Sequence, residues 1–536
     1  MGNQNIYSKP VTLRNILKFA VPTIAMSVFM SFYTMVDGLF VSNLIGTDAL
    51  SAINLTAPVI QLVTAISTML ATGGSAVIMK KMGEHRNEEA KEDFTFLILV
   101  NVAAGLVMCG AGYLVMERIF AGMDLSAAVA GYCTEYLSRY LLFTVPILLM
   151  NNFTLYMIAS EKAALSLLCS VAGGVLNMVL DYVLIEMLSM GIGGAAVATG
   201  LGYSVTAVTG LFVFSRKKSL LHFKRPVLRL RVLAAAASNG CSEMATALVT
   251  GIVTMMFNWT MLRYVGEDGV AAVTIIMYVL MFASSLYTGY SYGVAPMISY
   301  YFGEQRLEEQ KGTAGFSEPR SGRITGLRGE EPDCAALSFA EPHGGRITGL
   351  RGKEPDCAAR SFAEPRSGKI TELRSEELDH TFSLPVKPYD GQEGETGSSA
   401  GKLKKLISIS LRVIAFISVL TVVASLLLTK PLVSVFARPD NPVFALAVTG
   451  NRICTASLLF IGFNIFASGM FTALSNGVIS AVLAFSRSFV FMLITMLVLP
   501  ALLGVNGIWL ATPAAELMAL ALSAAMFRRY RKKYGY

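Results

Sequence analysis

The nine residues Gly83–Lys91 read GEHRNEEAK, and Gly303–Lys311, 220 positions later, read GEQRLEEQK. The same spacing separates a second pair of segments, IGTDALSAI at 45–53 and VGEDGVAAV at 265–273. Ordered matches at one spacing indicate an internal repeat with a long period. The chain therefore consists of two related halves.

Matching residues further along the chain, such as Asn151 and Asn464, are 313 positions apart. The increase from 220 to 313 places 93 additional residues in the second half. Within them, the segment that begins at Glu318 is copied twice, at intervals of 23 residues. Its Gly, Pro, Arg and Glu content cannot bury enough apolar surface to offset chain entropy. We expect 312–400 to be a disordered cytoplasmic insertion that transport does not require.

The composition is that of a membrane protein. Of the 536 residues, 54% are hydrophobic and 15% are charged, against about 25% charged in soluble domains. The net charge of +8 does not indicate a nucleic-acid partner, because the basic residues gather in loops between apolar runs and at the C-terminus. The first apolar run, 16–44, is too long for the core of a signal peptide and is expected to remain as the first span.

Apolar runs predict twelve membrane spans, six in each half. The predicted spans are 14–43, 50–80, 94–117, 126–159, 163–187 and 192–215, then 231–262, 269–301, 403–430, 441–474, 478–503 and 507–528. Lys and Arg collect in alternate loops, which predicts a multi-pass protein of the inner (plasma) membrane with both termini in the cytoplasm.

Six spans per half is an even number, so both halves enter the membrane in the same direction. The predicted fold is all-α, with two pseudo-symmetric six-helix bundles and a central cleft between them. The N-terminal bundle is expected over 1–230. The second is expected over 231–311, which holds its first two helices, and 401–536, which holds its last four helices and a basic tail.

Acidic residues within a span are functional candidates, because an ionised carboxylate in hydrocarbon costs at least ~2.5–3.5 kcal/mol. The prediction is that three such acids exist: Asp37, Asp181 and Glu243. Asn177 and Asp181 are four residues apart, so they project from one helical face. Pro22, fifteen residues before Asp37, can bend the first span because it frees a backbone carbonyl.

Several short motifs occur in order along the first half, and their order resembles that of multidrug and toxic compound extrusion transporters. The motifs are Val21-Pro22, Val36-Asp37-Gly38-Leu39-Phe40-Val41, Leu44-Ile45-Gly46, Gly73-Gly74-Ser75, Met82-Gly83, Leu176-Asn177, Leu180-Asp181 and Gly191-Ile192-Gly193-Gly194-Ala195-Ala196. The resemblance covers the chain apart from the insertion. It implies a monomeric antiporter that exports lipophilic, cationic drugs or toxic compounds by alternating access, without a cofactor.

The resemblance also implies a cation site in the first half, built from Asp37, Asn177, Asp181 and Thr199. Their oxygen donors suit an alkali cation, and apposed carboxylates also tend to share a proton. Sodium and proton coupling therefore both remain open.

Some members of that family use a further site in the second half, whose positions here are Glu243 and Asn464. Asn464 stands where a charge is expected, so a second full cation site is in doubt. Asn151, Tyr136 and Tyr140 are further candidates for coupling or substrate contact.

Two alternatives follow from the same sequence. A lipid-linked oligosaccharide flippase has a related two-lobe fold, but such proteins line the cavity with several cations, and here the mid-span cations are Arg139, Arg452 and Arg487. A membrane enzyme is disfavoured, because the HExxH and DDxxD motifs are missing and all four His fall in loops. A Cys/Cys/His metal site in the insertion is also disfavoured, because duplication alone explains the spacing.

Overall fold

The computed structural model describes residues 7, 9–44, 47–121, 127–314 and 398–536. Within these ranges the chain is helical and contains no strand. Among the described residues, eleven helical segments are long and apolar enough to cross a membrane. The number is twelve if α4 (Ala127–Leu142) and α5 (Thr144–Ala159), a pair bent by 54°, form one span. The prediction of an all-α polytopic fold with about twelve spans is confirmed.

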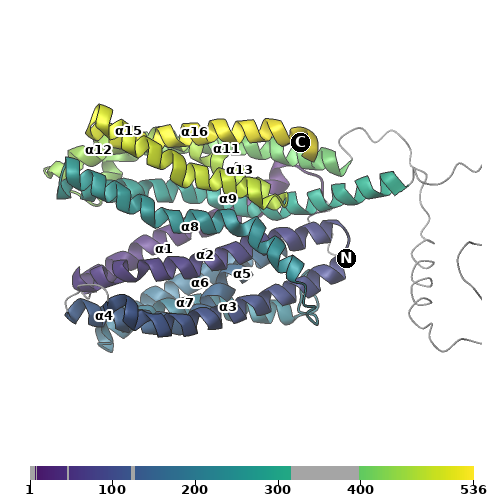
Figure 1. The fold of residues 1–536 in the computed structure, drawn as a ribbon, viewed down its shortest axis with the longest axis horizontal. Coiled ribbons are helices and arrows are strands. Elements are labelled where there is room, and N and C mark those ends of the chain that lie inside the picture. Colours follow the sequence, from purple (N-terminus) through teal and green to yellow (C-terminus); the bar gives the residue numbers. More distant parts are fainter. Residues whose placement is uncertain (1–6, 8, 45–46, 122–126, 315–397) are drawn as a thin grey trace, which may run out of the picture. The chain divides into compact units, whose positions relative to one another are not determined.

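The N-terminal lobe contains the first seven α-helices. They are α1 (Leu13–Leu44), α2 (Thr47–Gly83), α3 (Asn87–Ala121), α4, α5, α6 (Ala163–Asp181) and α7 (Gly191–Ser215), with a π-helical turn η2 (Tyr182–Met187) after α6. Within the lobe, α6 packs on α7 and α1, and α5 packs on α2 and α7. Figure 1 shows these helices running nearly parallel.

The C-terminal lobe begins with α8 (Leu230–Tyr264) and α9 (Glu267–Ala314). It continues with α11 (Ser399–Ser434), α12 (Pro442–Cys454), η4 (Thr455–Ser457), α13 (Leu458–Ala473), α14 (Gly477–Phe485), η5 (Ser486–Phe491), α15 (Met492–Leu503) and α16 (Val505–Tyr534). Equivalent glycines of the repeat, Gly191 and Gly504, precede or begin α7 and α16 with φ of 57° and 59°. The local backbone thus follows the repeat read from the sequence.

The two lobes touch through glycines that let backbones approach closely. A Cβ added at Gly240 of α8 would lie 1.9 Å from the carbonyl oxygen of Met69 in α2. The repeat motif itself forms a second crossing, because a Cβ at Gly83 would lie 2.0 Å from the carbonyl oxygen of Tyr300 and one at Gly303 would lie 2.1 Å from that of Lys80. Only glycine fits such contacts.

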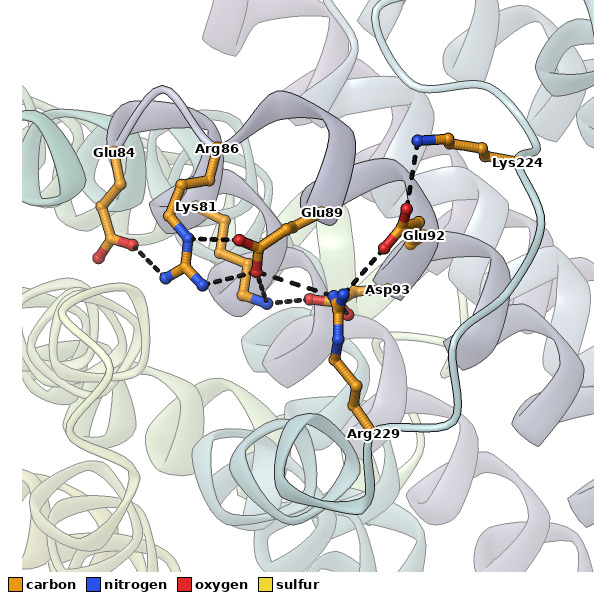
Figure 2. A network of polar contacts seen from close by, with 8 residues as sticks. All are labelled: Lys81, Glu84, Arg86, Glu89, Glu92, Asp93, Lys224 and Arg229. Atoms are coloured by element: carbon orange, nitrogen blue, oxygen red, sulfur yellow. Dashed lines mark hydrogen bonds and ion pairs between the residues drawn. The ribbon is translucent and has the colours of Figure 1, made fainter. Parts of the chain in front are cut away.

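The turn 84–86 and the linker 216–229 lie at one end of the bundle, which we call the basic end. A network of ion pairs lies there, beside this crossing. Figure 2 shows how it joins α2, α3 and the linker. Arg229 pairs with Asp93 and with Glu92, each at 2.9 Å, and Lys81 also pairs with the fully buried Asp93. Hydrogen bonds to Glu88 and Glu92 raise the pKa of Lys224. The network clamps the linker between the lobes onto the N-terminal lobe.

The predicted insertion, 312–400, lies outside the described residues except at its two edges. α9 continues to Ala314 and α11 begins at Ser399. The Cys and His residues of the disfavoured Cys/Cys/His metal site also lie outside the described residues.

Candidate functional site

Asn177 and Thr199 come together where α6 meets α7, and Asp181 lies one turn after Asn177 on α6. The Nδ2 of Asn177 donates to the Oγ1 of Thr199 at 3.3 Å, and that hydroxyl donates to the carbonyl oxygen of Ala195 at 3.0 Å. Asp181 is fully buried, and Asn177 is 1% exposed. The Oδ1 of Asn177 is buried and has no hydrogen-bond partner among the described residues. An acceptor oxygen without a donor is available to a cation.

The remaining predicted ligand, Asp37, is in α1, but its side chain lies outside the described residues. α1 packs on α6, since a Cβ added at Gly174 would lie 2.8 Å from the ring of Phe29 and 3.4 Å from that of Tyr33. α1 is continuous through Pro22. The backbone of α1 therefore runs along the helix that carries Asn177 and Asp181.

A cavity lies between the two lobes and has three adjoining parts, which we call the central cavity. The first part, of about 250 Å³, and the second, of about 400 Å³, share Leu155 of α5 with Ser284, Thr288 and Tyr292 of α9. The third and smallest part is lined by Met30, Tyr33, Met150, Ser170, Gly173, Gly174, Gly202, Tyr203 and Thr206.

The third part of the central cavity extends into the N-terminal lobe toward the predicted cation site. It ends at Gly173 and Gly202, where α6 and α7 meet. A Cβ at Gly202 would lie 3.0 Å from the Cβ of Asn177. The cavity and the α6–α7 cluster are therefore separated by about one layer of atoms.

Glu243 lines the first part of the central cavity, together with Arg487. It is the fourteenth residue of the 35-residue helix α8. No ion pair within 4.0 Å joins Glu243 to Arg487 in the described part of the chain. Glu243 is thus the acidic side chain that the described cavity wall presents.

Arg487 is held instead by an acid that the sequence analysis missed. Its Nε pairs with Glu516 at 2.8 Å, and Glu516, 6% exposed, also accepts a hydrogen bond from Asn464 at 2.8 Å. The prediction of three mid-span acids was therefore wrong, because Glu516 lies near the middle of the predicted span 507–528. The cost of placing a carboxylate within a membrane span, which identified the other three acids as candidates, applies to Glu516 as well.

The other predicted residues are placed differently from one another. Asn151 lines the second part of the central cavity and donates to the Oγ of Ser67 at 3.0 Å. Tyr136 and Tyr140 stack at 6.2 Å and are 7% and 3% exposed, inside a hydrophobic cluster of the N-terminal lobe. The structure therefore brings Asn151, but not the two tyrosines, to the described cavity wall.

Comparisons with known proteins agree with this architecture. The MatE family model matches residues 22–183. The multidrug export protein MepA of Staphylococcus haemolyticus is 23% identical over 288 residues, which is 53% of this chain and 64% of that protein. MepA of Staphylococcus aureus strain MRSA252 is 21% identical over 309 residues, which is 56% of this chain and 68% of that protein. The match thus spans somewhat under two thirds of the first relative's length.

Solved structures of similar fold cover nearly the whole chain. A MATE in complex with MaL6 superposes with a TM-score of 0.75 at 18% identity, over 97% of this chain and 96% of that one. An outward-facing MATE family transporter of the MOP superfamily gives a TM-score of 0.74 at the same identity and coverage. At 18% identity, this structural similarity shows a shared fold only. By the matched family model, the relatives and the fold, this chain is similar to the multidrug and toxic compound extrusion (MATE) family.

Proposed function

We propose that this chain is a secondary active antiporter that exports lipophilic cations in exchange for sodium ions or protons. The observation that carries the proposal is the central cavity, which lies between the lobes and extends from Glu243 to Gly173 and Gly202, beside the Asn177 cluster. This chain is similar to MATE transporters, so we propose transport and not an enzymatic activity.

The charge balance of the cavity supports a cationic substrate. Arg487 is neutralised by Glu516, so an ionised Glu243 leaves the described wall with one net negative charge. Serine, threonine, methionine and tyrosine side chains make up much of the rest of the wall, and such residues tolerate varied ligand shapes. Parts of about 250 and 400 Å³ suit a drug-sized molecule.

The coupling ion is proposed to bind at Asn177, Asp181 and Thr199, with Asp37 as the fourth ligand. The buried, unpartnered Oδ1 of Asn177 and the fully buried carboxylate of Asp181 support this assignment. An alkali cation accepts neutral and charged oxygen donors, and a proton would need only the carboxylates. Both coupling ions are compatible with this set of donors.

Exchange follows if the ion and the drug favour opposite conformations. The lobes are in contact at the basic end, which the distribution of Lys and Arg assigns to the cytoplasm. We take this as the state in which the cytoplasmic side of the cavity is closed. Ion binding in the N-terminal lobe would then lower drug affinity, and by linkage the drug would lower ion affinity equally.

The flippase alternative receives no support from the cavity. Among the described residues that line it, Arg487 is the one basic side chain, and Glu516 already neutralises it. A pyrophosphate group carries several negative charges and requires more cations than this wall provides.

The test is ethidium efflux from proteoliposomes, driven separately by a sodium gradient and by a pH gradient. We expect one gradient to drive efflux from wild-type vesicles and Asp181→Asn to abolish it at equal protein content. Efflux by Asp181→Asn at the wild-type rate would exclude coupling through this site. Absence of efflux under either gradient in wild-type vesicles would overturn the proposed antiport.

A further inference from the structure

A groove of about 450 Å³ lies between α11 and α16 at the basic end of the C-terminal lobe. Lys404 and Arg412 line it from α11, and Arg528 and Arg531 line it from α16. Figure 1 shows these two helices near the C-terminus. Both helices pack on α13, and the groove runs between them on the outside of the lobe.

Three of the four basic side chains of the groove, Lys404, Arg412 and Arg528, have no hydrogen-bond or ion-pair partner of acidic type in the described part of the chain. No acidic residue lines the groove, and none of the ion pairs in the described residues includes these three cations. The Nε of Arg531 donates to the backbone oxygen of Tyr536 at 3.2 Å. Like charges in one hollow repel each other, so an anion placed among them would be strongly favoured.

The spacing of these cations matches an elongated ligand. Lys404, Ser408 and Arg412 follow one another at intervals of four, so they form one stripe along α11. Eight residues of helix correspond to about 12 Å. Arg528 and Arg531 are three residues apart and so share one face of α16. The cations thus line both walls of the groove over a length greater than one phosphate.

The floor of the groove is apolar. Ile407, Leu411 and Phe527 line it between the charged residues. A groove that offers cations together with an apolar floor suits a ligand with both an anionic head and a hydrocarbon chain. Its place at the end of two membrane-spanning helices puts it at the depth of lipid headgroups.

We propose that this groove is a binding site for an anionic phospholipid of the leaflet at the basic end. The phosphate would be held by Lys404, Arg528 and Arg531, and an acyl chain would lie against Leu411 and Phe527. Arginine and lysine bind phosphate through charge-assisted hydrogen bonds. The site is independent of the central cavity and of the proposed transport. A lipid bound there would be a structural lipid of the C-terminal lobe.

The test measures lipid retention by native mass spectrometry of the detergent-purified full chain. The probes are phosphatidylglycerol, phosphatidylethanolamine and inorganic phosphate. The groove variant combines Lys404→Gln, Arg528→Gln and Arg531→Gln. A matched control removes the same charge from neighbours that do not line the groove, and it combines Lys405→Gln, Arg529→Gln and Lys532→Gln.

We expect phosphatidylglycerol to bind the wild type and the control variant alike, and the groove variant about tenfold more weakly. The single change Arg528→Gln should weaken phosphatidylglycerol binding by an intermediate amount. It replaces the triple variant in the test if the triple variant is unstable. Equal weakening in the control variant would show attraction by overall charge and overturn the site. Equal binding of phosphatidylethanolamine, or binding of inorganic phosphate as tight as that of the lipid, would overturn the assignment to an anionic phospholipid.

Discussion

Replacing Gly240 by alanine should shift the protein away from the state in which the lobes are closed at the basic end. The added Cβ would lie 1.9 Å from the carbonyl oxygen of Met69, whereas an ordinary contact begins near 3.4 Å. α2 and α8 must therefore separate by about 1.5 Å, since the obstacle is backbone and no side-chain rotation relieves it. Overpacking of this kind costs about 1–3 kcal/mol, which corresponds to a shift of roughly 5- to 150-fold in the equilibrium between the two states.

The assay is the reactivity of a cavity cysteine toward a membrane-impermeant maleimide. Thr288→Cys, in a cysteine-free background, places the reporter where the first two parts of the central cavity meet. The reagent is applied from the side that the basic end faces. Gly240→Ala should increase the rate of labelling by at least fivefold.

Gly251→Ala is the matched control, because Gly251 lies on the same helix and a Cβ there would meet nothing within 4 Å. It should leave the labelling rate unchanged. The same rate in Gly240→Ala, Gly251→Ala and the unsubstituted protein would refute the idea that this glycine contact holds the closed state.

Three further expectations can be measured on the purified or reconstituted protein. Thr199→Ala should weaken the dependence of efflux on the coupling ion less than Asp181→Asn does, because it removes a neutral oxygen and not a charge; identical ion dependence in Thr199→Ala and wild type would remove Thr199 from the site. Arg487→Met should cost up to about 3–5 kcal/mol of unfolding free energy in mixed micelles, because it leaves the buried Glu516 carboxylate without its cation. Adding Glu516→Gln should recover much of that loss, and strictly additive costs would show that the two side chains are not coupled. Deletion of 315–398 should preserve efflux, so a well-expressed but inactive deletion protein would contradict a spacer role.

The architecture could be predicted because its determinants are local in the sequence. A span is recognised by about twenty apolar residues in succession. A repeat is recognised by comparing the chain with itself, as GEHRNEEAK and GEQRLEEQK show. The insertion was predicted from a change in spacing. The proximity of Asn177 to Asp181 was also predictable, since four residues along a helix form one turn.

The arrangement of the C-terminal lobe was decided by tertiary structure. Asn464, Arg487 and Glu516 lie on α13, η5 and α16, and only the packing of these segments brings their side chains within hydrogen-bond distance. In the same way, Tyr136 and Tyr140 are buried within the N-terminal lobe, while Asn151 reaches the cavity. Membrane helices are apolar on most of their faces, so their sequences do not specify their rotation about the helix axis. That rotation is determined by contacts between helices that are distant in the chain.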